Sequence, residues 1–307
     1  MSSSSDILPL KQAFAHFPNI GPVRLQLMRQ AGIRQWDDIE PNPPPPLNNW
    51  SYFWEDIYNA AVDAREAFAN GNLQFFTQNL KPSDRWRLLH LKLSQTTFID
   101  IETSGLESLD NYITTIVAFD GQKLHTFVKN ENLEDFPDFL LTLKFIVTYN
   151  GSTFDLPKIM REFNLPNIPV PHVDLRWLCH NCFLDGGLKN IEKTLNINRP
   201  EDIKGTDGND AVILCNQWVN SNDHNARRKL VKYCAADTIS LLLVARKLLE
   251  IHNCDNVQDN EGNPWIVLDQ IPQCKTNQIT PVQNETSNTQ HSINDRLKAF
   301  LNKKRRH

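Results

Sequence analysis

The sequence predicts an α/β fold with a mixed five-stranded sheet and helices on both faces, preceded by a small helical segment. Two observations predict it. Residues 10–33 and 50–70 are expected to be helical, and three short apolar strands, two of them joined by a hairpin turn, begin near residue 97. After those strands, helices and strands alternate along the chain. Hydrophobic residues make up 40% of the 307 residues, which is sufficient for a substantial buried core.

The N-terminal part is predicted to be helical. Residues 10–33 are predicted to form two short helices around a turn, and residues 50–70 form a longer one, because their apolar side chains recur at three- and four-residue steps. The prolines at residues 44–46 predict a linker between them, since a proline run does not enter an α-helix. We therefore expect one segment at residues 1–40 and a proline-rich linker with a helix at residues 41–94.

Residues 95–252 are predicted to hold the sheet. Strands are expected at residues 97–101, 113–119, 124–128, 145–149 and 173–175, and Asp120-Gly121 is a hairpin turn signal between the second and third. Helices are expected at residues 133–143, 155–163, 187–196, 208–219 and 225–251. Residues 253–307 are predicted to be a polar, partly disordered tail with order at residues 265–268, a short helix near residues 294–302 and a basic end.

Composition excludes several classes of protein. The net charge of -4 argues against broad electrostatic coating of nucleic acid, although a local basic site remains open. No apolar run approaches the roughly 18 residues of a membrane helix, and the first residues do not resemble a secretory signal. Six cysteines are too few for a disulfide scaffold. We expect a cytoplasmic protein with no membrane partner.

Four acidic residues follow an order that suits a site for two metal ions. Asp100 and Glu102 lie two residues apart at the end of the first strand, so both carboxylates project from the same face. Asp155 follows the fourth strand at the start of a helix, and Asp237 lies in the last long helix, one turn after Tyr233. Carboxylates suit Mg²⁺ or Mn²⁺. Two such ions about 4 Å apart activate water and stabilise the leaving oxygen in phosphodiester hydrolysis.

This ordered set resembles a known family. FIDIETSGL at residues 98–106, YNGSTFD at residues 149–155 and YCAAD at residues 233–237 resemble the three motifs of the DEDD exonucleases, and the tyrosine is typical of the DEDDy branch. HVDL at residues 172–175 and GLKNIE at residues 187–192 are similar to YprB-type members of that superfamily. The resemblance covers residues 95–252 and implies a ribonuclease H-like fold.

The resemblance also implies a function and a role for each site residue. The function is metal-dependent 3′→5′ exonuclease activity on DNA or RNA, by a two-metal mechanism at a 3′ end. The four acids, Asp100, Glu102, Asp155 and Asp237, would hold two Mg²⁺ or Mn²⁺ ions. Tyr233 would orient the attacking water.

Other interpretations of these residues stay open. Singly, Asp100 could cap a turn, Asp155 could be a helix N-cap and Asp237 could be an exposed helical acid. The chain could be a nucleic-acid-binding module that retains a metal site but has little turnover. Cys179 and Cys182 have the spacing of half a zinc site, although no second pair follows, and buried thiols explain them better.

A second nucleic-acid contact is predicted near the N-terminus. Residues 18–33 look like one helix-hairpin-helix unit, which binds the phosphate backbone through N–H groups at a helix N-terminus. Asn19 stands where that unit usually has glycine, and a plain helical hairpin used for packing explains the segment equally well. The candidate nucleic-acid contacts of the chain are Gly21, Arg24, Asn150 and Lys189.

Overall fold

The computed structural model describes residues 8–105, 111–205, 208–254 and 262–271. The chain divides into two compact units, residues 1–93 with 248–257 and residues 94–247 with 258–307. The helix expected near residues 294–302 and the basic end lie outside the described residues. Within the described ranges, no helix has both the length and the apolar character needed to cross a membrane.

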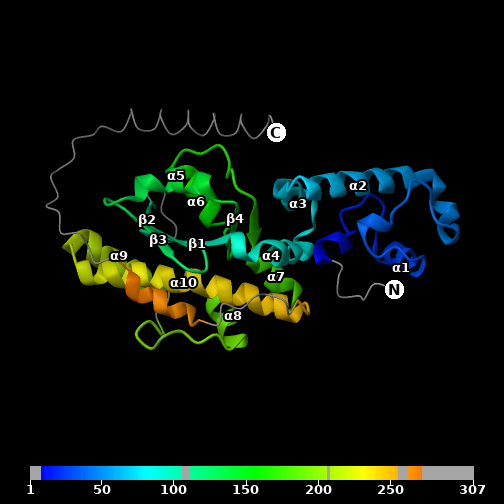
Figure 1. Cartoon of the computed structure of the whole chain (residues 1–307). Coiled ribbons are helices and arrows are strands. Elements are labelled where there is room, and N and C mark those ends of the chain that lie inside the picture. Colours follow the sequence, from blue (N-terminus) through cyan, green and yellow to red (C-terminus); the bar gives the residue numbers. More distant parts are fainter. Residues whose placement is uncertain (1–7, 106–110, 206–207, 255–261, 272–307) are drawn as a thin grey trace. The chain divides into compact units, whose positions relative to one another are not determined.

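The first unit consists of helices (Figure 1). Its α-helices are α1 (Pro22–Gln30), α2 (Ser51–Ala69), α3 (Leu73–Asn79) and α4 (Trp86–Lys92), and its 3₁₀ helices are Pro9–Gln12, Trp36–Asp38, Pro45–Trp50 and Pro82–Asp84. The buried Trp36 indole donates to the Ala13 carbonyl at 2.7 Å and stacks on Phe76. Trp54 donates to the Glu40 carbonyl at 2.9 Å. Side chains from both sides of residue 40 therefore share one core.

The proline run forms a short helix where the sequence predicted a linker. Pro45–Trp50 is a 3₁₀ helix that leads directly into α2, and its Leu47 and Trp50 side chains are buried. Proline is compatible with a first helical turn because its fixed φ is already helical and its missing N–H has no intrahelical partner there. The neighbouring Phe53 and Trp54 side chains are also buried, whereas Tyr52 is exposed.

The second unit contains the predicted mixed five-stranded sheet, which confirms the fold class. Its strands are β1 (Thr96–Thr103), β2 (Ile113–Phe119), β3 (Leu124–Val128), β4 (Phe145–Thr148) and β5 (His172–Asp174), in the order β3-β2-β1-β4-β5. β1 pairs antiparallel with β2 and parallel with β4, and β4 pairs parallel with β5. The β2–β3 turn has Gly121 at a φ of 94°, and Asp120 Oδ1 accepts from the N–H groups of Gln122 and Lys123.

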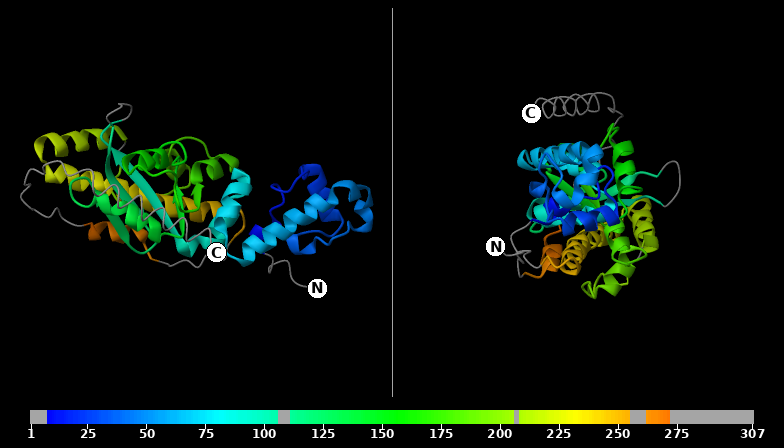
Figure 2. Two further views of the ribbon diagram at one scale, coloured as in Figure 1. Left: turned by 90° about the horizontal axis from the view of Figure 1, so that it is seen from above. Right: turned by 90° about the vertical axis from the view of Figure 1, so that its right-hand side faces the viewer.

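Helices cover both faces of this sheet (Figures 1 and 2). The helices of this part of the chain are α5 (Phe136–Thr142), α6 (Asp155–Glu162), α7 (Leu175–Asn181), α8 (Leu188–Thr194), α9 (Gly208–Ser221) and α10 (His224–Ile251), and 3₁₀ helices are formed by Leu93–Gln95, Leu133–Asp135 and Pro264–Gln270. The apolar cluster on one face includes Ile99 and Ile101 of β1, together with Phe136 of α5 and Ile159 of α6. In Figure 1, α10 runs along the opposite face.

Candidate active site

The alternation of side chains along β1 directs two carboxylates toward α10. Ile99 and Ile101 enter the core against α5 and α6, so Asp100 and Glu102 project from the other face. There the Cys234 thiol of α10 lies 3.4 Å from Asp100 Oδ2. Possible ligand atoms of Asp100, Glu102 and Cys234 lie within 4.8 Å of one another. The strand and the last long helix therefore meet at this point.

The four predicted acids form one electrostatic cluster. Burial raises the pKa of Asp100 well above its usual range, and the nearby carboxylates of Asp237, Asp155 and Glu102 raise it further. The pKa of Glu102 is also raised well above its usual range, first by burial and then by the nearby Asp237 carboxylate. Burial raises the pKa of Asp155 to about 7. The structure thus brings together all four acids from β1, α6 and α10, at the cost of mutual repulsion.

A divalent cation fits this set of residues. The donors are carboxylate oxygens, which Mg²⁺ and Mn²⁺ prefer, and a cation between them would relieve the repulsion that raises their pKa values. The Cys234 thiol sits at the border of the cluster, and burial raises its pKa well above the usual range, so it remains an uncharged thiol. The site therefore has the chemistry of an oxygen-ligated metal centre.

Asp237 differs from the other three acids because two basic side chains contact it. Lys189 Nζ lies 2.5 Å from Asp237 Oδ1, and Arg199 Nη2 also contacts Oδ1. Arg199 is held from the other side by Glu192, whose carboxylate accepts from Nε at 3.0 and 3.1 Å. The Arg199 and Glu192 side chains are each only 6% exposed, and Arg199 Nη1 is buried with no hydrogen-bond partner. Both contacts to Asp237 use one oxygen, so Oδ2 is the oxygen that we expect to face a cation.

Tyr233 lies one turn before Asp237 on α10 and is buried beside the same cations. Lys189 Nζ is 4.6 Å from its ring centroid, and the Arg199 guanidinium carbon is 5.9 Å away. Burial raises the pKa of Tyr233, and the carboxylates of Asp237, Glu102 and Asp100 raise it further. The hydroxyl therefore stays protonated at neutral pH and can donate a hydrogen bond, but it is a poor base.

The loop before Asp155 is fixed by Asp174 at the end of β5. Asp174 Oδ1 accepts from the Asn150 N–H at 2.7 Å, and Oδ2 accepts from the Ser152 N–H at 2.9 Å. Asn150 adopts a φ of 63°, which asparagine tolerates better than most residues. Its side-chain oxygen accepts from Arg176. Asn150 thus shapes the loop that delivers Asp155 to the cluster.

Gly151 occupies a position in this loop where no side chain fits. A Cβ placed there would lie 2.1 Å from Thr148 Oγ1 and 2.5 Å from Thr148 Cβ. Thr148 is itself buried at the end of β4, where its hydroxyl pairs with His172 Nε2 at 2.8 Å. The glycine allows the chain to turn back tightly over the strand toward Asp155.

The two N-terminal candidates belong to the first unit, whereas the four acids belong to the second. Gly21 is the N-cap of α1, and Asn19 adopts a φ of 61°, so asparagine does supply the turn conformation expected there. Arg24, however, donates to the Asn19 carbonyl at 2.7 Å, and its guanidinium carbon lies 4.6 Å from the Phe53 ring centroid. The Arg24 guanidinium therefore makes its contacts within the first unit.

The half zinc site has no completing ligands among the residues described. Cys179 and Cys182 belong to no group of three or more potential metal ligands there. Cys179 is buried in α7, and its pKa is raised to about 12, chiefly by that burial. A protonated, buried thiol at this position is a packing residue and a poor zinc ligand.

A comparison with protein-family models agrees with the fold. Residues 97–249 match the model of a family described as the RNase H superfamily, which confirms the ribonuclease H-like fold class. No curated protein matches the chain. A similar solved structure is the family B DNA polymerase from the hyperthermophilic archaeon Pyrobaculum calidifontis, with 17% identity and a TM-score of 0.41 over 50% of this chain. The aligned part spans only 24% of that polymerase.

Proposed function

We propose that this protein is a metal-dependent 3′→5′ exonuclease that hydrolyses phosphodiester bonds of DNA or RNA by a two-metal mechanism. The observation that carries the proposal is the meeting of four carboxylates from β1, α6 and α10 near the end of the central strand β1, with raised pKa values for Asp100, Glu102 and Asp155. The RNase H superfamily match over residues 97–249 supports hydrolysis of nucleic acid. The 3′→5′ direction rests on the resemblance of the three sequence motifs to DEDDy exonucleases.

Asp100, Glu102, Asp155 and Asp237 would hold the metal ions. Bound there, divalent ions would activate a water molecule and stabilise the leaving oxygen of the phosphodiester. The buried Tyr233 hydroxyl stays protonated, so its role is to donate a hydrogen bond that orients the water. Asp237 is itself oriented by Arg199, which Glu192 anchors.

Lys189 has a different role from Arg199, because it is far less constrained. Its side chain is 38% exposed, compared with 6% for Arg199. It can leave Asp237 when a cation binds and still remain within reach of a phosphate at the site. We assign Lys189 to the electrostatic stabilisation of the bound strand.

One observation favours a second candidate function, a nucleic-acid-binding module with little turnover. Two cations already neutralise Asp237, so metal binding must compete with an internal ion pair at one of its four ligands. A site with weak metal affinity would bind a strand and hydrolyse it slowly. Metal-dependent turnover separates the two candidates.

The test uses single-stranded DNA and RNA labelled at the 5′ end, incubated with Mg²⁺ or Mn²⁺. We expect a ladder of labelled products that shortens from the 3′ end and is lost with EDTA or in Asp237→Asn. The matched control is Asp56→Asn, because Tyr52 and Asp56 repeat the Tyr-x-x-x-Asp spacing in α2, outside the cluster, and Asp56 is exposed.

Each outcome addresses a separate part of the proposal. Internal fragments without a ladder contradict exonuclease action, and single labelled nucleotides released from the 5′ end contradict the direction. Titration of Mn²⁺ by calorimetry should give two ions per chain, and one ion contradicts the two-metal mechanism. Binding without cleavage favours the binding module.

A further inference from the structure

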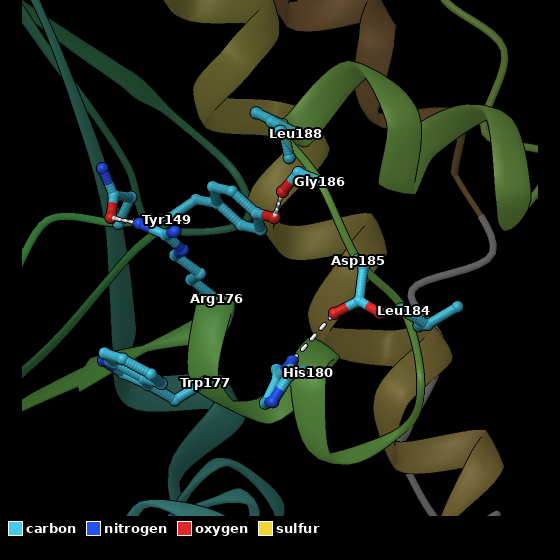
Figure 3. Close-up of a pocket in the computed structure, with 10 residues that line it drawn as sticks. Tyr149, Arg176, Trp177, His180, Leu184, Asp185, Gly186 and Leu188 are labelled. Atoms are coloured by element: carbon cyan, nitrogen blue, oxygen red, sulfur yellow. Dashed lines mark hydrogen bonds and ion pairs between the residues drawn. The ribbon is translucent and has the colours of Figure 1, made fainter.

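A pocket of about 590 Å³ is lined by residues that follow β4, by α7 and by the segment that leads into α8 (Figure 3). One wall is formed by Tyr149 and Asn150, just after β4, and by Arg176 and Trp177 of α7. The other wall is the segment of residues 184–188, which leads into α8. Two short stretches of chain link the pocket lining to the candidate site. Asn150 belongs to the loop that positions Asp155, and the residue after the second wall is Lys189, which contacts Asp237.

The first wall presents an exposed indole and a guanidinium, neither of which belongs to the acidic site. Trp177 is 43% exposed at the pocket, although tryptophan usually buries most of its ring. Arg176 lies beside it and brings a positive charge, with Nη1 directed to the side-chain oxygen of Asn150. An exposed indole face next to a guanidinium suits a ligand that is both planar aromatic and anionic.

The second wall is held in place by hydrogen bonds across the pocket. The Tyr149 hydroxyl donates to the Gly186 carbonyl at 2.5 Å, and His180 Nδ1 pairs with Asp185 Oδ1 at 2.8 Å (Figure 3). The His180 and Asp185 side chains are 68% and 73% exposed, so their remaining polar atoms can meet a ligand. Leu184 and Leu188 add apolar surface to the lining. The pocket is therefore preorganised and offers both donors and acceptors to a ligand edge.

We propose that this pocket is a nucleotide subsite that holds one unpaired nucleotide of the bound strand, with its base against Trp177 and its phosphate near Arg176. Base stacking on an aromatic side chain tolerates any base, and the His180–Asp185 pair supplies hydrogen bonds to the base edge. The inference rests on the proposed function, since a strand with its phosphodiester at the four acids places a neighbouring nucleotide at the pocket. A base in a duplex cannot enter, so the pocket selects an unpaired end.

The test measures binding by the full chain, with Ca²⁺ in place of Mg²⁺ and with a check that the strand stays intact. The probe is a fluorescent single strand of ten nucleotides, followed by anisotropy. Trp177→Ala should weaken binding by about fivefold or more, the range for the loss of one stacked base. The matched control is Phe183→Ala, because Phe183 is 93% exposed and lies outside the pocket lining. This control should bind as the wild type does.

A second arm identifies the nucleotide. One abasic position is moved through the last four nucleotides of the strand. At one abasic position, the wild type should lose as much affinity as Trp177→Ala loses on the intact strand. The Trp177→Ala variant should bind that abasic strand as tightly as it binds the intact strand. Arg176→Ala should reduce the magnitude of the slope of log affinity against log salt concentration by about one, because it removes one phosphate contact.

Several results would overturn the subsite. These are wild-type affinity in Trp177→Ala, an equal loss in Phe183→Ala, additive losses for Trp177→Ala at every abasic position, or no strand binding at all. The proposed function fails separately. If the wild type never cleaves but the coupling between Trp177 and one base is found, the pocket stands without the exonuclease. If cleavage occurs without that coupling, only the pocket fails.

Discussion

Replacing Arg199 with methionine should destabilise the second unit strongly. Arg199 is the shared partner of two carboxylates, Glu192 and Asp237, and all three side chains are at most 12% exposed. Methionine keeps most of the side-chain length but removes the charge. It would leave Glu192 without its cation in a nearly dry environment and Asp237 with Lys189 alone.

The magnitude follows from this burial. Removing one partner of a buried ion pair costs about 3–5 kcal/mol, because the remaining charge has lost its compensation. For a folding unit of this size, about 1 kcal/mol shifts the melting temperature by about 2–4 °C, so we expect a decrease of about 10 °C. The exposed Arg228→Met on α10 is the control, and its effect should stay within about 0.5 kcal/mol.

Scanning calorimetry of the full chain is the appropriate assay, because the chain has two compact units that can melt separately. Glu192→Gln should cost stability in the wild type but restore part of it in Arg199→Met, since it then removes an unpaired charge. The double-variant cycle should show a coupling of about 0.5–3 kcal/mol. Strictly additive effects, or a small effect of Arg199→Met alone, would refute the reasoning.

Three further perturbations have defined outcomes. Gly151→Ala should lower the melting temperature by the equivalent of about 1–3 kcal/mol, because its Cβ would lie 2.1 Å from Thr148 Oγ1; an unchanged melting curve contradicts this. Lys189→Ala should raise Mn²⁺ affinity several-fold in calorimetry, because it removes a competing cation from Asp237, and weaker Mn²⁺ binding contradicts the competition. His16 should make the first unit acid-sensitive, because burial lowers the pKa of its imidazole from about 6.5 to about 4. The contribution of the neutral imidazole to the free energy of unfolding is therefore complete above pH 6.5 and is lost as the pH falls toward 4. Between pH 8 and pH 5 the wild type should lose up to about 2 kcal/mol of unfolding free energy at this residue, and pH-dependent denaturation should show that His16→Phe removes the loss.

Local signals predicted the sheet well and the shortest helices poorly. β2 and β3 match the expected residues, because apolar runs and an Asp-Gly turn are read directly from neighbouring residues. Among the seven-residue helices, α5 and α8 were predicted, but α3, α4 and α7 were not, since fewer than two turns give little periodicity. Helices α3 and α7 begin at side-chain caps, Asn72 and Asp174 respectively, and those caps were the available signal.

The acids of the site could be grouped from the sequence, but their partners could not. Motif order singled out Asp100 and Asp237, whereas Tyr-x-x-x-Asp spacing alone also occurs in α2. The contacts of Cys234 with Asp100 and of Arg199 with Asp237 depend on how α10 packs against β1 and against the segment after α8, which no local pattern encodes. Contacts across long sequence separations are therefore the part that required the structure.

The chain order of the four acids has a consequence for protein synthesis. Three of them reside in β1 and at the start of α6, but Asp237 belongs to α10. At about 5–20 residues per second, the ribosome adds Asp237 on the order of ten seconds after Asp100. A nascent chain can pair its central strands during that interval while it still lacks one of the four proposed ligands, so the proposed hydrolytic activity would arise only once the last helix has emerged and docked.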